Sequence, residues 1–477
     1  MKAKVDNIDS LINEVISKCN SDPQIYSNIM QDFFKNGIEK KNVWLDSLNI
    51  LPPFNTNQLL SNFKMNIYKL TNFIKTEVRP KLDIYQVLSC IFGAFYGDAI
   101  GAFCEFLTPN LRNQRNIFNL GATVIGGVKG QITDDSEMAL SLAYGLMDMP
   151  NKHELDPNYI YFYYGAWSKS HPLDIGSTTT KALKPFNFVD YHPKRQNFTV
   201  VEQEIQKKNM ASLSNGFLMR KSPFIAWLYY RFYYEINNTF SMSNNTLLPL
   251  YNSIKVLSEN DNKITNPNNQ TNVVMGFYGL MALMAIKGFN AGVILNNIYY
   301  LCNDPYFKQN IGDEKAVAET IIYYIDLYKN PNFNLWNEFG DKKSKQSVYV
   351  HMGYYLHSIK LLLYFLFNFE KIEPNHPERK YREIMNQICN LGGDTDTNCC
   401  IVGTVIGPII GMSNFGNDFN KMLELIPPGR GIYSAALVLL LVLYLGKSNK
   451  DQNLINNDKY FLQQLLTMLY GEIQIGY

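Results

Sequence analysis

The sequence lacks an excess of charge of either sign. Its 44 Lys and Arg residues nearly balance 42 Asp and Glu residues, which leaves a formal net charge of +2 over 477 residues. No basic stripe occurs along the chain. Polyanion-binding surfaces are usually strongly basic, so the sequence gives no strong signal of a nucleic-acid partner.

The sequence also lacks a long hydrophobic run. The first ten residues contain no apolar segment of the kind that begins a secretory signal. The most apolar run, residues 435–445, is too short to cross a bilayer and is typical of a buried core helix. We therefore expect a cytoplasmic protein without a membrane partner.

Cysteine is sparse and follows no metal-binding or redox spacing. There are seven cysteines, an odd number, and no two are separated by two residues. Cys399 and Cys400 are adjacent, which disfavours a simple bridge between them. This usage predicts reduced core thiols in the cytosol.

No series of alternating residues or β-hairpin signals is found, so the predicted fold class is all-α. Helical spacing appears at 8–16 and 57–76, and Pro52 and Pro53 interrupt the segment between them. We expect a helical N-terminal extension over 1–80 and the main domain over 81–477. The extension is interpreted as packing on the main domain, with a partner-binding module as the alternative.

The segment at 392–397 reads Gly-Gly-Asp-Thr-Asp-Thr and precedes a small, apolar stretch. Buried carboxylates need cations, donors or metal ions around them. Carboxylate and hydroxyl oxygens are ligands that suit Mg²⁺, Ca²⁺ or Mn²⁺ better than zinc. This segment therefore predicts half of a metal site.

A second acidic segment, Thr-Asp-Asp-Ser-Glu-Met at 133–138, follows a glycine-rich turn and opens an Ala/Leu-rich helix. Asp134 and Glu137 fit a capping pattern, so a capped helix is the alternative interpretation. A cap uses one acidic group, whereas two stand here after a threonine. The same composition recurs at 394–397, and we predict that the two segments form one metal site.

Glycines recur at every fourth position at 93, 97 and 101, and again at 403, 407 and 411. Each costs a helix about 1 kcal/mol relative to Ala, so a close backbone approach is expected in return. Glu105 continues the first stripe by one further turn. If the two helices pack face to face, Glu105 approaches Asp394 and Asp396.

Two polar loops are further candidates for ligand contacts. Residues 174–180 place Gly176, Ser177 and Thr178 at a helix start, where exposed N–H groups can hold a phosphate, although a Ser/Thr-capped helix is the default interpretation.

The second loop, at 212–220, contains Ser214, Asn215 and Gly216, a sequence that fits a tight turn. Asn215 is able to hydrogen-bond a ligand, and Arg220 is a candidate ion-pair partner. Farther on, residues 260–272 are rich in Asn and predict a loop.

The motifs at 97–105, 133–138, 215–220 and 392–397, in this order, resemble those of the ADP-ribosylglycohydrolase family. That family includes the dinitrogenase reductase-activating glycohydrolase and the ADP-ribosyl-acceptor hydrolases. The resemblance extends over about residues 85–445 and leaves the N-terminal extension outside.

The resemblance implies a compact all-α domain with two Mg²⁺ ions, Mn²⁺ being possible. It implies catalytic roles for Glu105, as general acid or base, and for Asp134 and Asp135. It implies diphosphate and ribose contacts in the loops at 176–178 and 214–216. The implied metal ligands come from both acidic segments: Thr133, Asp134, Asp135, Asp394, Asp396 and Thr397.

The reaction implied by the resemblance is hydrolysis of the bond between ADP-ribose and an acceptor. The partner would be an ADP-ribosylated protein or another ADP-ribose conjugate. The oligomeric state is unknown from the sequence, and a monomer is favoured. An inactive ADP-ribose-binding relative and a hydrolase of another glycosidic substrate are the alternatives. Two positions depart from the family pattern: Ser214 stands where a Gly is frequent, and Asn266 where many members have a His.

Overall fold

The computed structural model describes residues 82–107, 123, 130, 132–149, 154–169, 172–187, 198–232, 236 and 244–415. The predicted N-terminal extension at 1–80 and the predicted helix at 435–445 lie outside these residues. Within them the chain is helical, and the only β-type pairing is an isolated bridge between Ser214 and Tyr354. The all-α prediction is therefore confirmed.

The described residues form longer helices and several short helical segments. The helices of the described part are α5 (Leu82–Ala102), α7 (Asp134–Asp148), α8 (Pro157–Lys169), α9 (Ser177–Leu183), α10 (Phe198–Asn209), α11 (Gly216–Met219), α12 (Ser222–Arg231), α14 (Asn244–Thr265), α15 (Asn269–Ile286), α16 (Ala291–Cys302), α17 (Pro305–Gln309), α18 (Asp313–Tyr328), η4 (Trp336–Gly340), α19 (Tyr355–Phe367), η5 (Phe369–Lys371), α20 (Pro377–Leu391), α21 (Thr395–Ile410) and η6 (Met412–Asn414).

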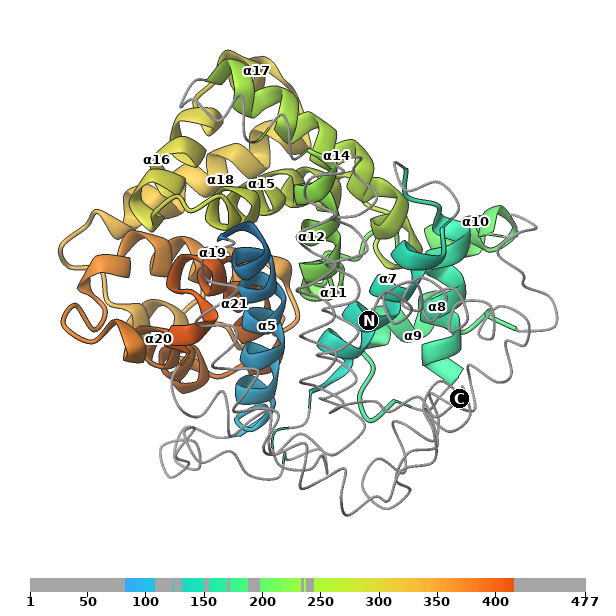
Figure 1. Cartoon of the computed structure of the whole chain (residues 1–477), viewed down its shortest axis with the longest axis horizontal. Helices are drawn as coiled ribbons and strands as arrows, with labels where there is room; N and C mark the ends of the chain where they lie inside the picture. The colour runs from blue at the N-terminus through green and yellow to red at the C-terminus, as the bar shows by residue number, and fades with distance from the viewer. Residues whose placement is uncertain are drawn as a thin grey trace, which may run out of the picture.

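Helices α5 and α21 pack against each other at the centre of the molecule (Figure 1). The two glycine stripes form this contact. A Cβ atom at Gly97 would stand 2.3 Å from the carbonyl oxygen of Cys399, and one at Gly403 would stand 2.3 Å from that of Gly93. Because these neighbours are backbone atoms, no side chain fits between the helices. The predicted face-to-face packing of the two stripes is confirmed.

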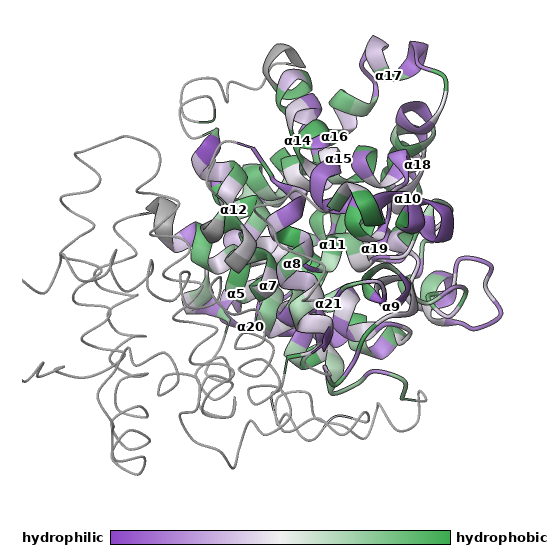
Figure 2. Ribbon diagram, turned by 90° about the vertical axis from the view of Figure 1, so that its right-hand side faces the viewer, coloured by the Kyte–Doolittle hydropathy of each residue, from purple (hydrophilic) through white to green (hydrophobic). Residues whose placement is uncertain are grey.

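The other helices surround this pair. Helices α7 to α10 lie on one side, α19 and α20 on the other, and α14 to α18 across the top of the view in Figure 1. Hydrophobic residues gather on the inner helices such as α5, whereas an outer helix such as α10 carries more hydrophilic residues (Figure 2). Trp167 of α8 and Trp227 of α12 are among the largest fully buried side chains of the core.

No helix in the described part of the chain is both long enough and apolar enough to span a bilayer.

Two local interpretations differ from the structure. The capping pattern at Asp134 and Glu137, which was the alternative interpretation, does not form: Thr133 is the N-cap of α7 and makes no side-chain cap. The Glu137 carboxylate instead accepts a hydrogen bond from the indole of Trp167 at 3.0 Å. The loop predicted at 260–272 is mostly helical, because α14 continues to Thr265 and α15 begins at Asn269.

Candidate metal centre

Asp98, on the helix α5, holds the turn where α7 begins. Its carboxylate accepts hydrogen bonds from the backbone N–H and the hydroxyl of Thr133, the latter at 2.8 Å. It also accepts from the backbone N–H and the hydroxyl of Ser136. Asp98 therefore caps α7 from a distance and fixes the acidic segment of α7 against α5.

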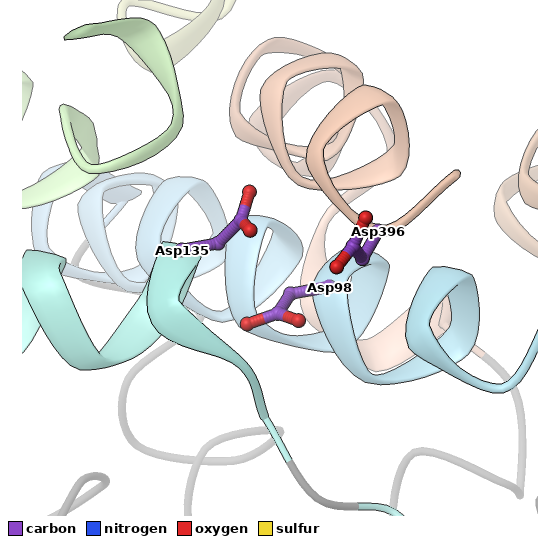
Figure 3. A group of neighbouring side chains, drawn as sticks. All are labelled: Asp98, Asp135 and Asp396. Atoms are coloured by element: carbon purple, nitrogen blue, oxygen red, sulfur yellow. The ribbon is translucent and has the colours of Figure 1, made fainter. Parts of the chain in front are cut away.

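Three helices bring three aspartates together. Asp98 of α5, Asp135 of α7 and Asp396 of α21 each offer a carboxylate oxygen, and these oxygens lie within 4.8 Å of one another (Figure 3). The hydroxyls of Thr133 and Thr397 join this group, at 3.1 and 3.3 Å from the Asp135 Oδ2 atom. The two acidic segments thus meet at the N-terminal ends of α7 and α21.

A second carboxylate group shares Asp396 with the first. Oxygens of Glu105, Asp174 and Asp396 lie within 4.8 Å of one another. Glu105 follows α5, and Asp174 lies in the loop before α9. The two groups are therefore parts of one acidic cluster.

The remaining predicted ligands lie at the border of this cluster. Asp134 accepts a hydrogen bond from the backbone N–H of Gly176 at 3.3 Å. Asp394 accepts one from the amide of Asn215 at 2.7 Å. Both loops that were predicted to contact a ligand are thus connected directly to the acidic cluster.

Simultaneous ionisation of all the carboxyl groups in this cluster is unfavourable. Burial, followed by the charges of Asp394, Asp174 and Asp134, raises the pKa of Glu105 to about 9. Burial also raises the pKa of Asp98 to about 6, against the effect of its four hydrogen-bond donors. For Asp134, Asp135 and Asp396, burial and then neighbouring carboxylates raise the pKa well above its usual range.

The cluster fits divalent cations. Oε2 of Glu105 and Oδ1 of Asp135 are buried acceptors that receive no hydrogen bond from the described residues. No Lys or Arg of the described part forms an ion pair with the cluster. An all-oxygen donor set with this excess of negative charge is typical of hard ions such as Mg²⁺ or Mn²⁺. Asp98 differs from Glu105 and Asp135 because protein donors contact both of its oxygens.

Asp98 and Asp174 were not singled out from the sequence, although both lie inside segments that were. Asp98 follows a glycine of the first stripe, and Asp174 precedes the hydroxyl-rich helix start. The available signal at Asp98 was a carboxylate placed directly after a glycine of a helix stripe that was expected to approach another backbone. Asp174 carried no signal beyond its proximity to Gly176.

The two substrate-loop candidates lie side by side. The hydroxyls of Thr178 and Ser212 are 3.0 Å apart, and those of Ser212 and Ser214 are 3.4 Å apart. The backbone N–H of Asn215 donates to the Gly353 carbonyl oxygen at 2.7 Å, which anchors the second loop to the segment before α19. The loops at 176–178 and 214–216 therefore form one polar surface beside the acidic cluster.

A buried cluster of charged side chains contacts the loop at 214–216 from the protein interior. Arg220 donates to the Gly216 carbonyl oxygen at 2.7 Å and pairs with Asp261 at 3.2 Å. Lys221 pairs with the same carboxylate, and the hydroxyl of Tyr164 donates to it at 2.7 Å. All of these side chains are fully buried. The ion-pair interpretation of Arg220 is thus confirmed, with a partner that the sequence did not indicate.

Comparison with known proteins identifies the family. The family model described as ADP-ribosylglycohydrolase matches residues 81–444. Because this match covers most of the chain, the protein belongs to the ADP-ribosylglycohydrolase family and is by class a hydrolase of glycosidic bonds. The family is metal-dependent, and the buried acidic cluster is able to bind a metal.

Individual relatives have the same family name. The chain is 28% identical over 340 residues to a putative ADP-ribosyl glycohydrolase of Acanthamoeba polyphaga mimivirus, covering 67% of this chain and 86% of that protein. It is 34% identical over 104 residues to the ADP-ribosyl-dinitrogen reductase glycohydrolase of Rhodospirillum rubrum, covering 21% of this chain and 34% of that protein. A solved structure titled ADP-ribosylglycohydrolase-related protein complex aligns with a TM-score of 0.49 and 18% identity, covering 77% of this chain and 99% of the other.

Proposed function

We propose that this protein is an Mg²⁺-dependent hydrolase, with Mn²⁺ as a substitute, that removes ADP-ribose from a modified protein side chain or a related acceptor. The observation that carries the proposal is the pair of carboxylate groups that share Asp396. Two overlapping groups suit two ions, whose positive charge would offset the repulsion within the cluster.

The proposed ligands of the two ions follow from their positions in and around the two carboxylate groups. The first ion would be held by Asp135 and Asp396 of the first group and by the adjacent hydroxyls of Thr133 and Thr397. Asp134 and Asp394 border the second group, beside Asp174 and Glu105. When bound, such ions supply Lewis acidity and charge neutralisation for the diol of the distal ribose.

Glu105 is the group proposed to move the proton. Its side chain is buried in the cluster, and its Oε2 atom receives no hydrogen bond from the described residues. As general acid, Glu105 would donate a proton from its carboxyl group to the leaving group. After the bond breaks, the resulting carboxylate accepts a proton from the incoming water.

The polar loops are proposed to bind the rest of the substrate. Ser177 and Thr178 offer N–H and hydroxyl donors for the diphosphate, next to Gly176, whose own N–H donates to Asp134. Asn215 is already tied to Asp394, so a sugar held between Ser214 and Gly216 lies next to the cluster. Arg220 keeps this loop in place through its bond to the Gly216 carbonyl oxygen.

Glu105→Gln tests this proposal. We expect release of ADP-ribose to fall by about 10²- to 10⁴-fold, as for loss of a general acid. ADP-ribose binding, measured by calorimetry with Mg²⁺, should change little, because the isosteric amide keeps the shape of the site. Glu314→Gln is the matched control, since Glu314 pairs with Lys255 on the α14–α18 side of the molecule.

Full activity of Glu105→Gln would remove Glu105 from the mechanism. Tight ADP-ribose binding by the wild-type protein without release from any conjugate would instead support the inactive-relative alternative.

A further inference from the structure

The side chains of Ser214 and Asn266 form a hydrogen-bonded pair next to the acidic cluster. Asn266 lies in the short loop between α14 and α15 and is fully buried. Its amide Nδ2 atom lies 3.0 Å from the Ser214 hydroxyl oxygen and 3.3 Å from the Ser214 carbonyl oxygen. The same atom lies 3.4 Å from the carbonyl oxygen of Ser212.

These contacts fix the direction of the bond between the two side chains. Carbonyl oxygens only accept, so the NH₂ group of Asn266, and not its oxygen, faces the loop. An amide N–H donates and cannot accept, so the Ser214 oxygen is the acceptor. The proton of the Ser214 hydroxyl is therefore left to donate elsewhere.

The hydroxyl of Ser214 has room to do so. Ser214 is only half-buried, whereas Asn266 behind it is fully buried. The adjacent Gly216 leaves space in front of this hydroxyl: a Cβ atom there would find the Ser214 and Thr179 hydroxyls as its nearest atoms, at 3.8 and 3.7 Å. The next residue, Asn215, contacts Asp394 of the cluster. The open side of the hydroxyl thus lies on the polar surface formed by the two substrate loops.

We infer that Ser214 is a substrate-binding hydroxyl of this enzyme and that Asn266 is the positioning residue that orients it. The hydroxyl donates to an oxygen acceptor of the bound ADP-ribose, either a diphosphate oxygen or a ribose hydroxyl. This inference rests on the proposed function, because that function identifies the ligand. Both positions depart from the family pattern described above, and the structure shows that the two departures contact each other.

Calorimetric titration with ADP-ribose in the presence of Mg²⁺ tests the pair. Ser214→Ala should weaken binding by about three- to tenfold, the value of one lost hydrogen bond. Asn266→Asp is isosteric but replaces the NH₂ group by an acceptor, which draws the Ser214 proton inward, so a similar loss is expected. Asn266→His keeps an N–H donor, so its affinity for ADP-ribose should stay within about twofold of the wild-type value.

The double variant Ser214→Ala/Asn266→Asp provides the sharper readout. If Asn266 acts through the hydroxyl, the losses are not additive, and the double variant binds about as weakly as Ser214→Ala alone. Ser253→Ala, a half-buried serine of α14, is the matched control. Thermal unfolding of each variant shows whether it is folded. If Asn266→Asp is not folded, the affinity of Ser214→Ala alone tests the inference.

Titration with ADP distinguishes the acceptor. A loss of affinity for both ADP and ADP-ribose assigns the diphosphate, and a loss for ADP-ribose alone assigns the distal ribose. Suppose that the wild-type protein binds and releases ADP-ribose while Ser214→Ala binds it with the same affinity. That result would overturn the inference and leave the proposed function intact. A wild-type protein that neither binds nor releases ADP-ribose would overturn both.

Discussion

Thr395 of α21 contacts the backbone of Gly101 in α5. The Thr395 hydroxyl donates to the Gly101 carbonyl oxygen at 2.7 Å, and a Cβ atom at Gly101 would stand 2.3 Å from the Thr395 carbonyl oxygen. Asp396 follows this contact, and Asp98 lies one helical turn before it. The packing of the two glycine stripes therefore sets the spacing of the carboxylates.

Gly101→Ala should severely destabilise the protein. The methyl group would overlap backbone atoms of α21, which cannot move without displacing Asp396. We expect a loss of at least about 3 kcal/mol in the free energy of unfolding, the upper range for overpacking. Gly292→Ala is the control, because its Cβ would meet only Asn290 Oδ1 at 3.6 Å inside α16. Denaturant unfolding of both variants checks this, and a Gly101→Ala protein as stable as Gly292→Ala would contradict the close packing.

Asp261→Asn should destabilise the protein by about 3–5 kcal/mol, because two buried cations lose their counter-charge. Arg220 and Lys221 both pair with this carboxylate. The less deeply buried pair of Lys255 and Glu314, whose side chains are 19% and 17% exposed, serves for comparison, since Glu314→Gln should cost less, about 1 kcal/mol. Equal midpoints of chemical unfolding for the two variants would show that the buried cluster is not needed for stability.

Asp98→Asn tests whether Asp98 positions the metal ligands. The amide offers one acceptor where four donors now converge, so the turn before α7 should loosen. Loss of such a supporting hydrogen bond lowers metal affinity by about 10- to 100-fold. Titration with Mn²⁺ followed by electron paramagnetic resonance measures the affinity and the number of ions. Loss of one whole ion, with the other bound normally, would instead make Asp98 a direct ligand.

Stabilisation of the fold by Mg²⁺ should increase with pH. The carboxyl groups of the cluster have raised pKa values in the folded protein, about 9 for Glu105 and about 6 for Asp98. Their contribution to stability is therefore full below the unfolded pKa of about 4 and is lost as the pH rises through the folded values. Mg²⁺ replaces the missing protons, so the rise in Tm over an EDTA-treated sample should be larger at about pH 8.5 than at about pH 6.

Other buried groups do not disturb that comparison. Burial lowers the pKa of Lys221 to about 8 and that of Lys360 to about 7, and this favours the folded state as the pH rises. These lysines act equally with and without Mg²⁺, so the difference in Tm isolates the acidic cluster. A difference that shrinks with rising pH would contradict a carboxylate metal site.

The central packing was predictable from the sequence because glycine has few reasons to recur every fourth residue in a helix. The acidic segments were recognisable because two carboxylates exceed what a helix cap needs. Asp98 was not predictable as the capping group, since its partner Thr133 lies 35 residues away and only the folded contact brings them together. Asp261 was hidden inside an asparagine-rich stretch that favours a loop, where packing against α8 and α11 stabilises a helix instead.

Release of free ADP-ribose is the measurement that tests the proposed metal-dependent hydrolysis most directly. A panel of Arg-linked, Ser-linked, polymeric and O-acetyl conjugates would be incubated with the wild-type protein in Mg²⁺, with the wild-type protein in EDTA, and with Asp134→Asn in Mg²⁺. Release from at least one conjugate is expected in Mg²⁺ alone, with loss in EDTA and in Asp134→Asn. Release that persists undiminished in EDTA and in the variant would contradict a metal centre built on these carboxylates.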